Sequence, residues 1–157
     1  IEDGINIVSA MSESAVMPNY TADYSLPGDY RTATGGGNIV MGSGSATDDL
    51  GPIGPALSRS TSYDGIRYGS GGYRNSIYSG GGEIRLRGGM ATTGQTGIEF
   101  GYNKSIFAGK GQIEISADNS TNTRGVEIGA NAASPGNIFS SADTHPAIKI
   151  SANNPST

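Results

Sequence analysis

One short pattern recurs four times between residues 82 and 128. In each copy a glycine precedes two apolar residues that are separated by one charged residue. The copies are Gly82-Glu83-Ile84-Arg85-Leu86, Gly97-Ile98-Glu99-Phe100, Gly111-Gln112-Ile113-Glu114-Ile115 and Gly125-Val126-Glu127-Ile128. Their first apolar residues lie 14, 15 and 13 positions apart. Because alternation at period two is typical of a strand with one buried face, the run predicts short strands stacked along one axis in a β-fibre.

The composition indicates whether one chain could bury such strands alone. Of the 157 residues, 26 are glycine and only 34% are hydrophobic, with no tryptophan. A compact monomer this poor in large apolar side chains would struggle to offset its conformational entropy. Disorder is disfavoured, because charged residues make up only 15% and the alternation recurs. We therefore expect obligate association, in which several chains contribute to one core.

Three chains around a common axis would satisfy these strands. Each predicted strand has only two inward side chains, and a trimer lets each pair meet its copies and hides the strand edges. A single-chain β-solenoid is the competing architecture, but its coils usually need ~20 residues or more with several strands each. The spacing of 13 to 15 residues leaves room for one strand per repeat, and we favour the trimer. The residues expected in the shared trimer core are Ile84, Leu86, Ile98, Phe100, Ile113, Ile115, Val126, Ile128, Ile148 and Ile150.

Several functional classes are disfavoured. The sequence has no cysteine, which excludes a disulfide scaffold and a thiolate metal site. A net charge of -4 argues against nucleic acid as a partner, and no stretch approaches the apolar length of a membrane span. His145, the only histidine, is expected in a turn beside Pro146, and Asp48-Asp49 matches no calcium-loop template. No metal or cofactor is predicted.

The composition and regularity of the sequence change near Gly80. Seven of the eight tyrosines precede that residue, and the simplest repeats follow it. Residues 1–79 are therefore predicted to form an irregular β and loop region rich in tyrosine, and residues 80–157 a regular repetitive β-fibre region.

The tyrosine-rich region contains the candidate glycan- or receptor-binding residues. Tyrosine offers a flat apolar face and a hydroxyl to a sugar ring, while arginine and aspartate bind sugar hydroxyls and carboxylates. Alternatively, Tyr68 and Tyr78 simply fill a wider section of core. Nothing in the sequence shows that these residues converge as a lyase site would require, and no catalytic residue is assigned. The candidates are Tyr63, Asp64, Arg67, Tyr68, Tyr73, Arg74 and Tyr78.

A second set of charged residues alternates with the apolar positions and is expected to project outward. Arginines could contact an acidic polysaccharide, but solubilising charge with cross-strand pairing is the favoured interpretation. The set is Arg85, Arg87, Glu99, Glu114, Glu127 and Lys149.

A glycine-rich chain with strands of the form Gly-Ile-x-Ile, no cysteine and many Asn, Ser and Thr turns resembles the triple-stranded β-helical shafts of bacteriophage tail fibres and tailspikes. The resemblance covers residues 82–150 and, more loosely, the first half. It implies an all-β, elongated, intertwined homotrimeric β-helix or β-prism fibre, located in the virion and extracellular. The implied partners are other tail proteins and a host surface polysaccharide or outer-surface receptor.

The function that this resemblance implies is a structural and host-attachment module. Residues 76–88 are also similar in style to the phage hyaluronan lyases, so a polysaccharide-degrading fibre is an alternative. A third possibility is a bacterial adhesin built as a single-chain β-solenoid. The resemblance further implies a C-terminal trimerisation chaperone that is later removed, in which case the gene would continue past Thr157.

Overall fold

The computed structural model describes residues 7–8, 32–46, 52–58, 64–69, 75–90, 96–101, 104–118, 125–129 and 137–153. Tyr63, Tyr73 and Arg74 lie outside these ranges. The described residues form strands and turns only, as the all-β prediction requires. No helix within them is long and apolar enough to cross a membrane.

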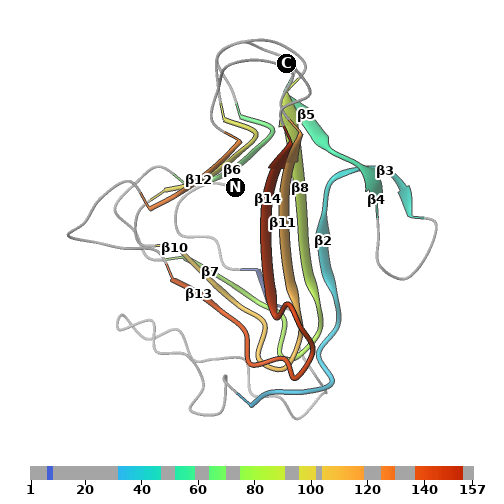
Figure 1. Ribbon diagram of the computed structural model, residues 1–157, viewed down its shortest axis with the longest axis vertical. Helices are drawn as coiled ribbons and strands as arrows, with labels where there is room; N and C mark the ends of the chain where they lie inside the picture. Colours follow the sequence, from blue (N-terminus) through green and yellow to red (C-terminus); the bar gives the residue numbers. More distant parts are fainter. Residues whose placement is uncertain are drawn as a thin grey trace.

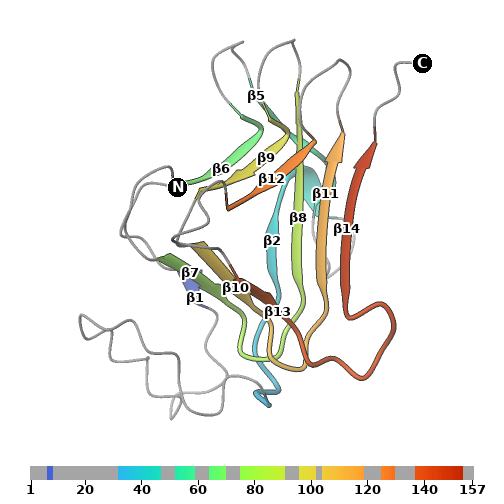
Figure 2. The ribbon, with the colours of Figure 1, turned by 60° about the vertical axis from the view of Figure 1, so that its left-hand side comes forward.

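Three parallel sheets account for most of the strands (Figures 1 and 2). Sheet 1 contains, in order, β1 (Ile7–Val8), β7 (Asn75–Tyr78), β10 (Lys104–Phe107) and β13 (Asn137–Phe139). Sheet 2 contains β14 (Ile148–Asn153), β11 (Ile113–Asp118), β8 (Ile84–Met90) and β2 (Ile39–Met41), and β5 (Ala56–Ser58) also pairs with β8. Sheet 3 contains β12 (Val126–Ile128), β9 (Ile98–Phe100) and β6 (Ile66–Tyr68).

The chain visits the sheets in a fixed rotation, from sheet 1 to sheet 2 to sheet 3 and back to sheet 1. Each circuit places a strand beside its counterpart one coil earlier. Val126 pairs with Ile98, 28 residues before it, and Ile148 pairs with Ile113, 35 residues before it. The described chain is therefore a parallel β-solenoid that winds through successive coils, and a coil takes about thirty residues.

This winding corrects our interpretation of the repeat. The steps of 14 and 13 residues lead from sheet 2 to sheet 3, and the step of 15 leads from sheet 3 to sheet 2 of the next coil, so two copies of the pattern belong to one coil. The sheet 1 strand at residues 104–107 lies within the step of 15 residues, between the copies that begin at Gly97 and Gly111, and was missed. The objection that the repeat is too short for a solenoid was wrong, because each coil contains three strands rather than one.

A hairpin interrupts the first coil. The antiparallel strands β3 (Ser43–Ala46) and β4 (Pro52–Gly54) separate β2 from β5, although both β2 and β5 pair with the same edge of β8. Figure 1 shows this pair projecting away from the three sheets. Strands from both predicted regions, residues 1–79 and 80–157, share the same sheets.

The interior is built from one chain. Six residues of the predicted trimer core are fully or almost fully buried against neighbouring coils of their own chain: Ile84, Leu86, Ile98, Phe100, Ile113 and Ile115. Val126, Ile128 and Ile148 are only partly buried, and Ile150 is 47% exposed. Stacked coils thus supply the inward neighbours that we had expected three chains to supply for the first six.

Glycine is required at the corner between sheets 1 and 2. A Cβ atom at Gly111 would overlap the carbonyl oxygen of Gly82, and one at Gly82 would overlap the backbone of Gly37. Successive coils approach too closely there for any side chain, which explains the glycines that lead the two copies on sheet 2, Gly82 and Gly111. Serine side chains close the same corner: the hydroxyls of Ser79 and Ser140 donate to the carbonyls of Gly82 and Gly111, each at 2.6 Å.

Candidate functional site

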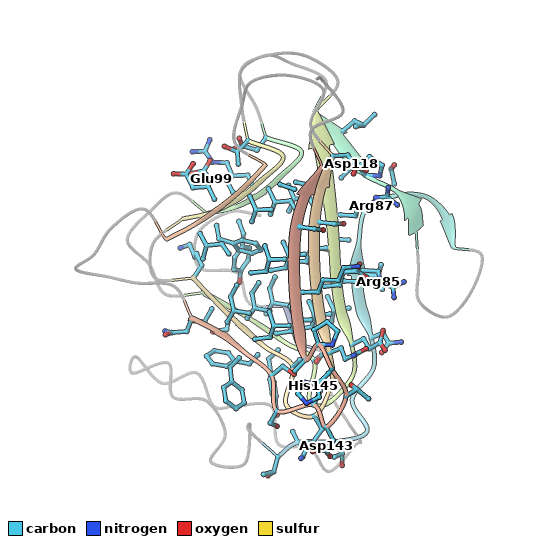
Figure 3. All side chains as sticks on the ribbon, viewed as in Figure 1. Arg85, Arg87, Glu99, Asp118, Asp143 and His145 are labelled. Atoms are coloured by element: carbon cyan, nitrogen blue, oxygen red, sulfur yellow. The ribbon has the colours of Figure 1, made fainter. Side chains whose placement is uncertain are left out.

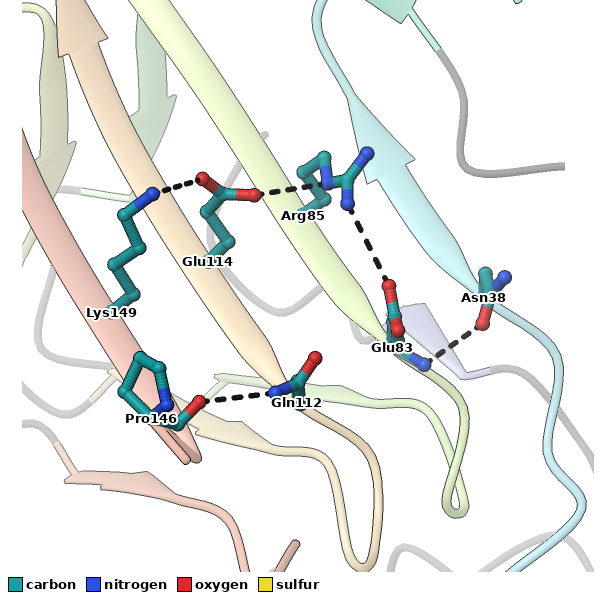
Figure 4. Close-up of polar contacts among 7 residues, drawn as sticks. All are labelled: Asn38, Glu83, Arg85, Gln112, Glu114, Pro146 and Lys149. Atoms are coloured by element: carbon teal, nitrogen blue, oxygen red, sulfur yellow. Dashed lines mark hydrogen bonds and ion pairs between the residues drawn. The ribbon is translucent and has the colours of Figure 1, made fainter. Parts of the chain in front are cut away.

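The outer face of sheet 2 carries a ladder of paired charges. Arg85, Glu114 and Lys149 occupy one register position on three adjacent strands. Glu114 lies between the two cations, with its Oε2 3.2 Å from Nε of Arg85 and its Oε1 3.2 Å from Nζ of Lys149 (Figure 4). Partly exposed pairs of this kind contribute about 0–1 kcal/mol each. The predicted cross-strand pairing is confirmed for these residues, and the charges largely neutralise one another.

A second ion pair joins β8 and β11 further along these two strands. Both Nη2 and Nε of Arg87 approach one carboxylate oxygen of Asp118, at 2.8 and 3.1 Å. The arginines that we considered for an acidic polysaccharide, Arg85 and Arg87, are thus each engaged by a carboxylate of the same chain. Figure 3 shows both on the outer side of the sheet, with Asp118 near Arg87.

The outer face of sheet 3 brings together carboxyl groups from successive coils. Asp64 precedes β6, and its side chain is 2% exposed; its Oδ1 accepts a hydrogen bond of 2.9 Å from the backbone N–H of Thr96. Glu99 lies at the centre of β9, in register with Arg67. Nε of Arg67 is 3.7 Å from Asp64 Oδ2 and 3.4 Å from Glu99 Oε2. We call Asp64 and Glu99 the carboxyl pair.

Burial shifts the pKa of Glu99. Desolvation is the main cause that raises the pKa of Glu99 to about 6, and a side-chain hydrogen bond with Asp64 adds to the increase. The positive charge of Arg67 lowers this pKa, while the charges of Asp64 and Glu127 raise it. Glu99 is therefore about half protonated near pH 6, where an ordinary glutamate is ionised.

The geometry of the carboxyl pair does not match glycoside hydrolysis. Retaining glycosidases hold their two carboxyl groups ~5 Å apart, and inverting enzymes hold them further apart to admit water. The carboxyl group of Asp64 is 2% exposed and accepts a hydrogen bond from the backbone of Thr96, so a sugar cannot reach it as a substrate of such an enzyme would have to. Glu99 can hold a proton near pH 6, and its partly exposed position on the outer face lets it respond to the pH of the medium.

The predicted glycan-binding residues that the structure describes do not form one site. Asp64 and Arg67 lie together, as described above. Tyr68 is 0% exposed and packs edge-on against Phe100, with ring centroids 5.9 Å apart. Tyr78 is 7% exposed and belongs to a separate apolar cluster with Ala33 and Phe107. Tyr68 and Tyr78 thus fill cores and cannot stack on a sugar, which is the alternative that the sequence left open.

The corner between β13 and β14 contains the only histidine. His145 and Asp143 lie in an exposed turn (Figure 3), where Asp143 Oδ1 pairs with Nζ of Lys110 at 3.2 Å. Pro146, in the same turn, accepts a hydrogen bond of 3.2 Å from the side chain of Gln112. The described residues contain no group of three or more His, Asp or Glu side chains arranged to hold a metal ion.

Sequence reasoning missed the carboxyl pair because it placed Asp64 among glycan ligands and Glu99 in a surface ladder. The signal was present: Asp64 lies two residues before Ile66, and Thr96, its hydrogen-bond donor, lies two residues before Ile98. Only the coil period brings these two positions together.

Comparison with protein-family models, with curated proteins and with solved structures finds no match for this chain. The function is therefore argued from the scaffold and its surface. That scaffold is a three-sided solenoid whose described surface arginines and lysines pair mainly within the chain.

Proposed function

We propose that this chain is a structural and host-attachment module of a bacteriophage tail fibre or tailspike, located in the virion and extracellular. The observation that carries the proposal is the continuous register of sheet 2, in which β2, β8, β11 and β14 align position by position. Such stacking gives a stiff body in which each coil supports the next. A fibre needs this property to hold a receptor-binding surface away from the particle.

The projecting hairpin is the element that we assign to attachment. β3 and β4 leave the first coil and return to it without disturbing the pairing of β2 and β5 with β8. An element inserted into a rigid scaffold can vary in sequence without destabilising the core, as binding loops do. Its partner would be a host surface polysaccharide or an outer-surface receptor.

The proposal includes a homotrimer, as the resemblance to tail fibres implies. Because each chain encloses its own core, this trimer would associate three solenoids through their outer faces in its described part. The expected species is elongated and has three times the 16.0 kDa mass of one chain. Light scattering and sedimentation velocity measure both the mass and the shape.

A single-chain solenoid adhesin of a bacterial surface is the second candidate. It is favoured by the burial of Leu86 and Ile115, both 0% exposed without help from another chain. A monomer in solution supports this candidate and contradicts the trimer. A polysaccharide lyase has less support, since Tyr68 and Tyr78 are buried; unsaturated products from hyaluronan or another charged glycan would revive it.

Attachment is tested by competition. Purified chain should reduce adsorption of the phage that encodes it, and a variant in which residues 43–54 are replaced by a short Gly-Ser linker should not. Circular dichroism of the variant checks that the solenoid remains folded. Failure of the intact, folded chain to compete would contradict the attachment function.

A further inference from the structure

The outer face of sheet 2 borders the foot of the projecting hairpin. β2 pairs with residues 84–86 of β8 and β5 pairs with residues 88–90, so Arg87 lies between the two stretches. The hairpin formed by β3 and β4 leaves the first coil and returns to it beside this residue. Figure 3 shows Arg87 and Asp118 on the side of sheet 2 from which the hairpin projects.

Leu57 is an exposed apolar residue at this place. It lies on β5 in register with Gly89, and it is 54% exposed. A Cβ atom at Gly89 would lie 3.1 Å from Cδ2 of Leu57 and 2.9 Å from Cβ of Pro55, so these two side chains lean over a position that has no side chain of its own. Leu57 thus projects from the outer face of the sheet, and not along its edge, where a further strand would pair.

A partly exposed ion pair lies on the other side of Gly89. Asp118 is in register with Gly89 on β11, and its Oδ2 is 2.8 Å from Nη2 and 3.1 Å from Nε of Arg87. The side chains of Arg87 and Asp118 are 39% and 30% exposed. Since neighbouring strands lie about 4.8 Å apart, Leu57 and Asp118 are separated by roughly 10 Å across the sheet. We call Leu57, Arg87 and Asp118 the sheet 2 patch.

The sheet 2 patch combines the chemical groups that a carbohydrate requires. Arginine donates hydrogen bonds and aspartate accepts them, and a sugar hydroxyl does both. An exposed leucine offers apolar area to the C–H groups of a sugar ring, and burying that area from water is favourable. The charges of Arg87 and Asp118 neutralise each other, so the patch has no net charge with which to attract an acidic glycan.

We propose that the sheet 2 patch binds a neutral, hydroxyl-rich polysaccharide of the host surface, with a sugar ring against Leu57 and hydroxyls hydrogen-bonded to Arg87 and Asp118. This inference deepens the proposed attachment function and rests on it for the source of the glycan. A protein receptor fits the patch less well. Protein interfaces have an apolar core of many residues, whereas Leu57 is the exposed large hydrophobic residue that the described part of this face provides.

Binding is tested by titrating the intact chain with neutral polysaccharides (dextran, galactomannan and a β-glucan) and with hyaluronan as the acidic comparison. At least one neutral polysaccharide is expected to bind more tightly than hyaluronan. Its affinity should be equal at low and high salt, because salt does not screen the contacts of an uncharged ligand. Binding of hyaluronan alone, or of no polysaccharide, would overturn the proposal.

Variants locate the bound polysaccharide on the patch. Leu57→Asp and Arg87→Ala should each weaken binding about tenfold, since they remove apolar contact and hydrogen-bond donors. Leu57→Tyr should retain binding, because a tyrosine ring offers a sugar a flat apolar face. Arg85→Ala is the matched control and should leave the affinity unchanged: Arg85 also pairs with a glutamate, but its neighbour Val40 on β2 is only partly exposed. An affinity that none of the patch variants changes would place the glycan elsewhere and overturn the proposal.

The adsorption assay separates this inference from the attachment function. A chain that competes with the phage for adsorption but binds no neutral polysaccharide would retain the attachment function and overturn the inference. A chain that binds a neutral polysaccharide through the patch but does not compete would contradict the attachment function and support the patch as a glycan site. Circular dichroism and thermal unfolding check that each variant is folded before its affinity is compared.

Discussion

Asp64 and Glu99 belong to successive coils, and Nε of Arg67 approaches both of their carboxyl groups, lying 3.7 Å from Asp64 Oδ2 and 3.4 Å from Glu99 Oε2. Burial of Glu99 and the neighbouring charge of Asp64 both favour the protonated form of Glu99. The backbone N–H of Thr96 donates to Asp64 Oδ1, which fixes the position of the Asp64 carboxyl group. This arrangement couples the folded structure to pH.

Stability should fall as the pH rises from about 4.5 to about 6. The pKa of Glu99 is about 6 in the folded chain and 4.5 in an ordinary glutamate. Since the folded state binds the proton more tightly, its contribution is complete below pH 4.5 and is lost as the pH rises through 6. The full effect is about 2 kcal/mol. Urea unfolding between pH 4.5 and 7.5 measures it.

The matched variants for this prediction are Glu99→Gln and Glu114→Gln. Glu99→Gln should remove the decrease in unfolding free energy over this range, because glutamine does not titrate. Glu114→Gln should retain the decrease, because Glu114 lies between two cations on another sheet. A decrease that persists in Glu99→Gln would assign the pH dependence to another group.

Asp64→Asn should lower the pKa of Glu99. Both the hydrogen bond and the charge of Asp64 raise this pKa, and asparagine removes the charge while its amide oxygen still accepts from Thr96. Burial remains, so the pKa should stay above 4.5. A carbon-13 NMR titration of the Glu99 carboxyl follows the change directly. An unchanged midpoint would show that the charge of Asp64 contributes nothing.

Much of the fold could be predicted from local alternation, but the sheet 1 strand β10 could not. β8, β9 and β11 each carry apolar residues two positions apart, and the all-β class follows from them. In β10 the adjacent residues Ile106 and Phe107 are both buried, because they face separate apolar clusters on opposite sides of sheet 1. A period-two pattern cannot describe a strand that is buried on both faces.

The sequence also could not show whether neighbouring strands come from the same chain or from other chains, and the reason is different. An inward pair such as Ile113 and Ile115 has the same apolar surroundings whether its neighbours come from other chains or from other coils. What separates the two cases is the corner, where Gly82 and Gly111 stack within one chain. The carboxyl pair could not be predicted either. Asp64 and Glu99 come together only after one full coil, and the number of residues in a coil varies from 28 to 35.

Gly111→Ala should destabilise the chain. The added Cβ would overlap the carbonyl oxygen of Gly82 on the adjacent coil, and that backbone cannot move without disturbing the stacked corner. Forcing a methyl group into such a contact typically costs about 1–3 kcal/mol. Ser116→Ala, on the outer face of β11, is the control and should change the unfolding free energy by less than about 0.5 kcal/mol. Equal effects in the two variants would contradict close stacking at this corner.

Ile115→Ala and Ile150→Ala distinguish a core that one chain encloses from a core that three chains form together. The two residues occupy the same register position on adjacent strands, but Ile115 is fully buried and Ile150 is about half exposed. If each chain encloses its own core, Ile115→Ala should cost about 2–5 kcal/mol. Ile150→Ala should cost about 1 kcal/mol or less, because its side chain already contacts water. If three intertwined chains shared this column, both substitutions would be costly, and the cost would depend on protein concentration. Thermal unfolding of the two variants over a hundredfold range of concentration measures both quantities.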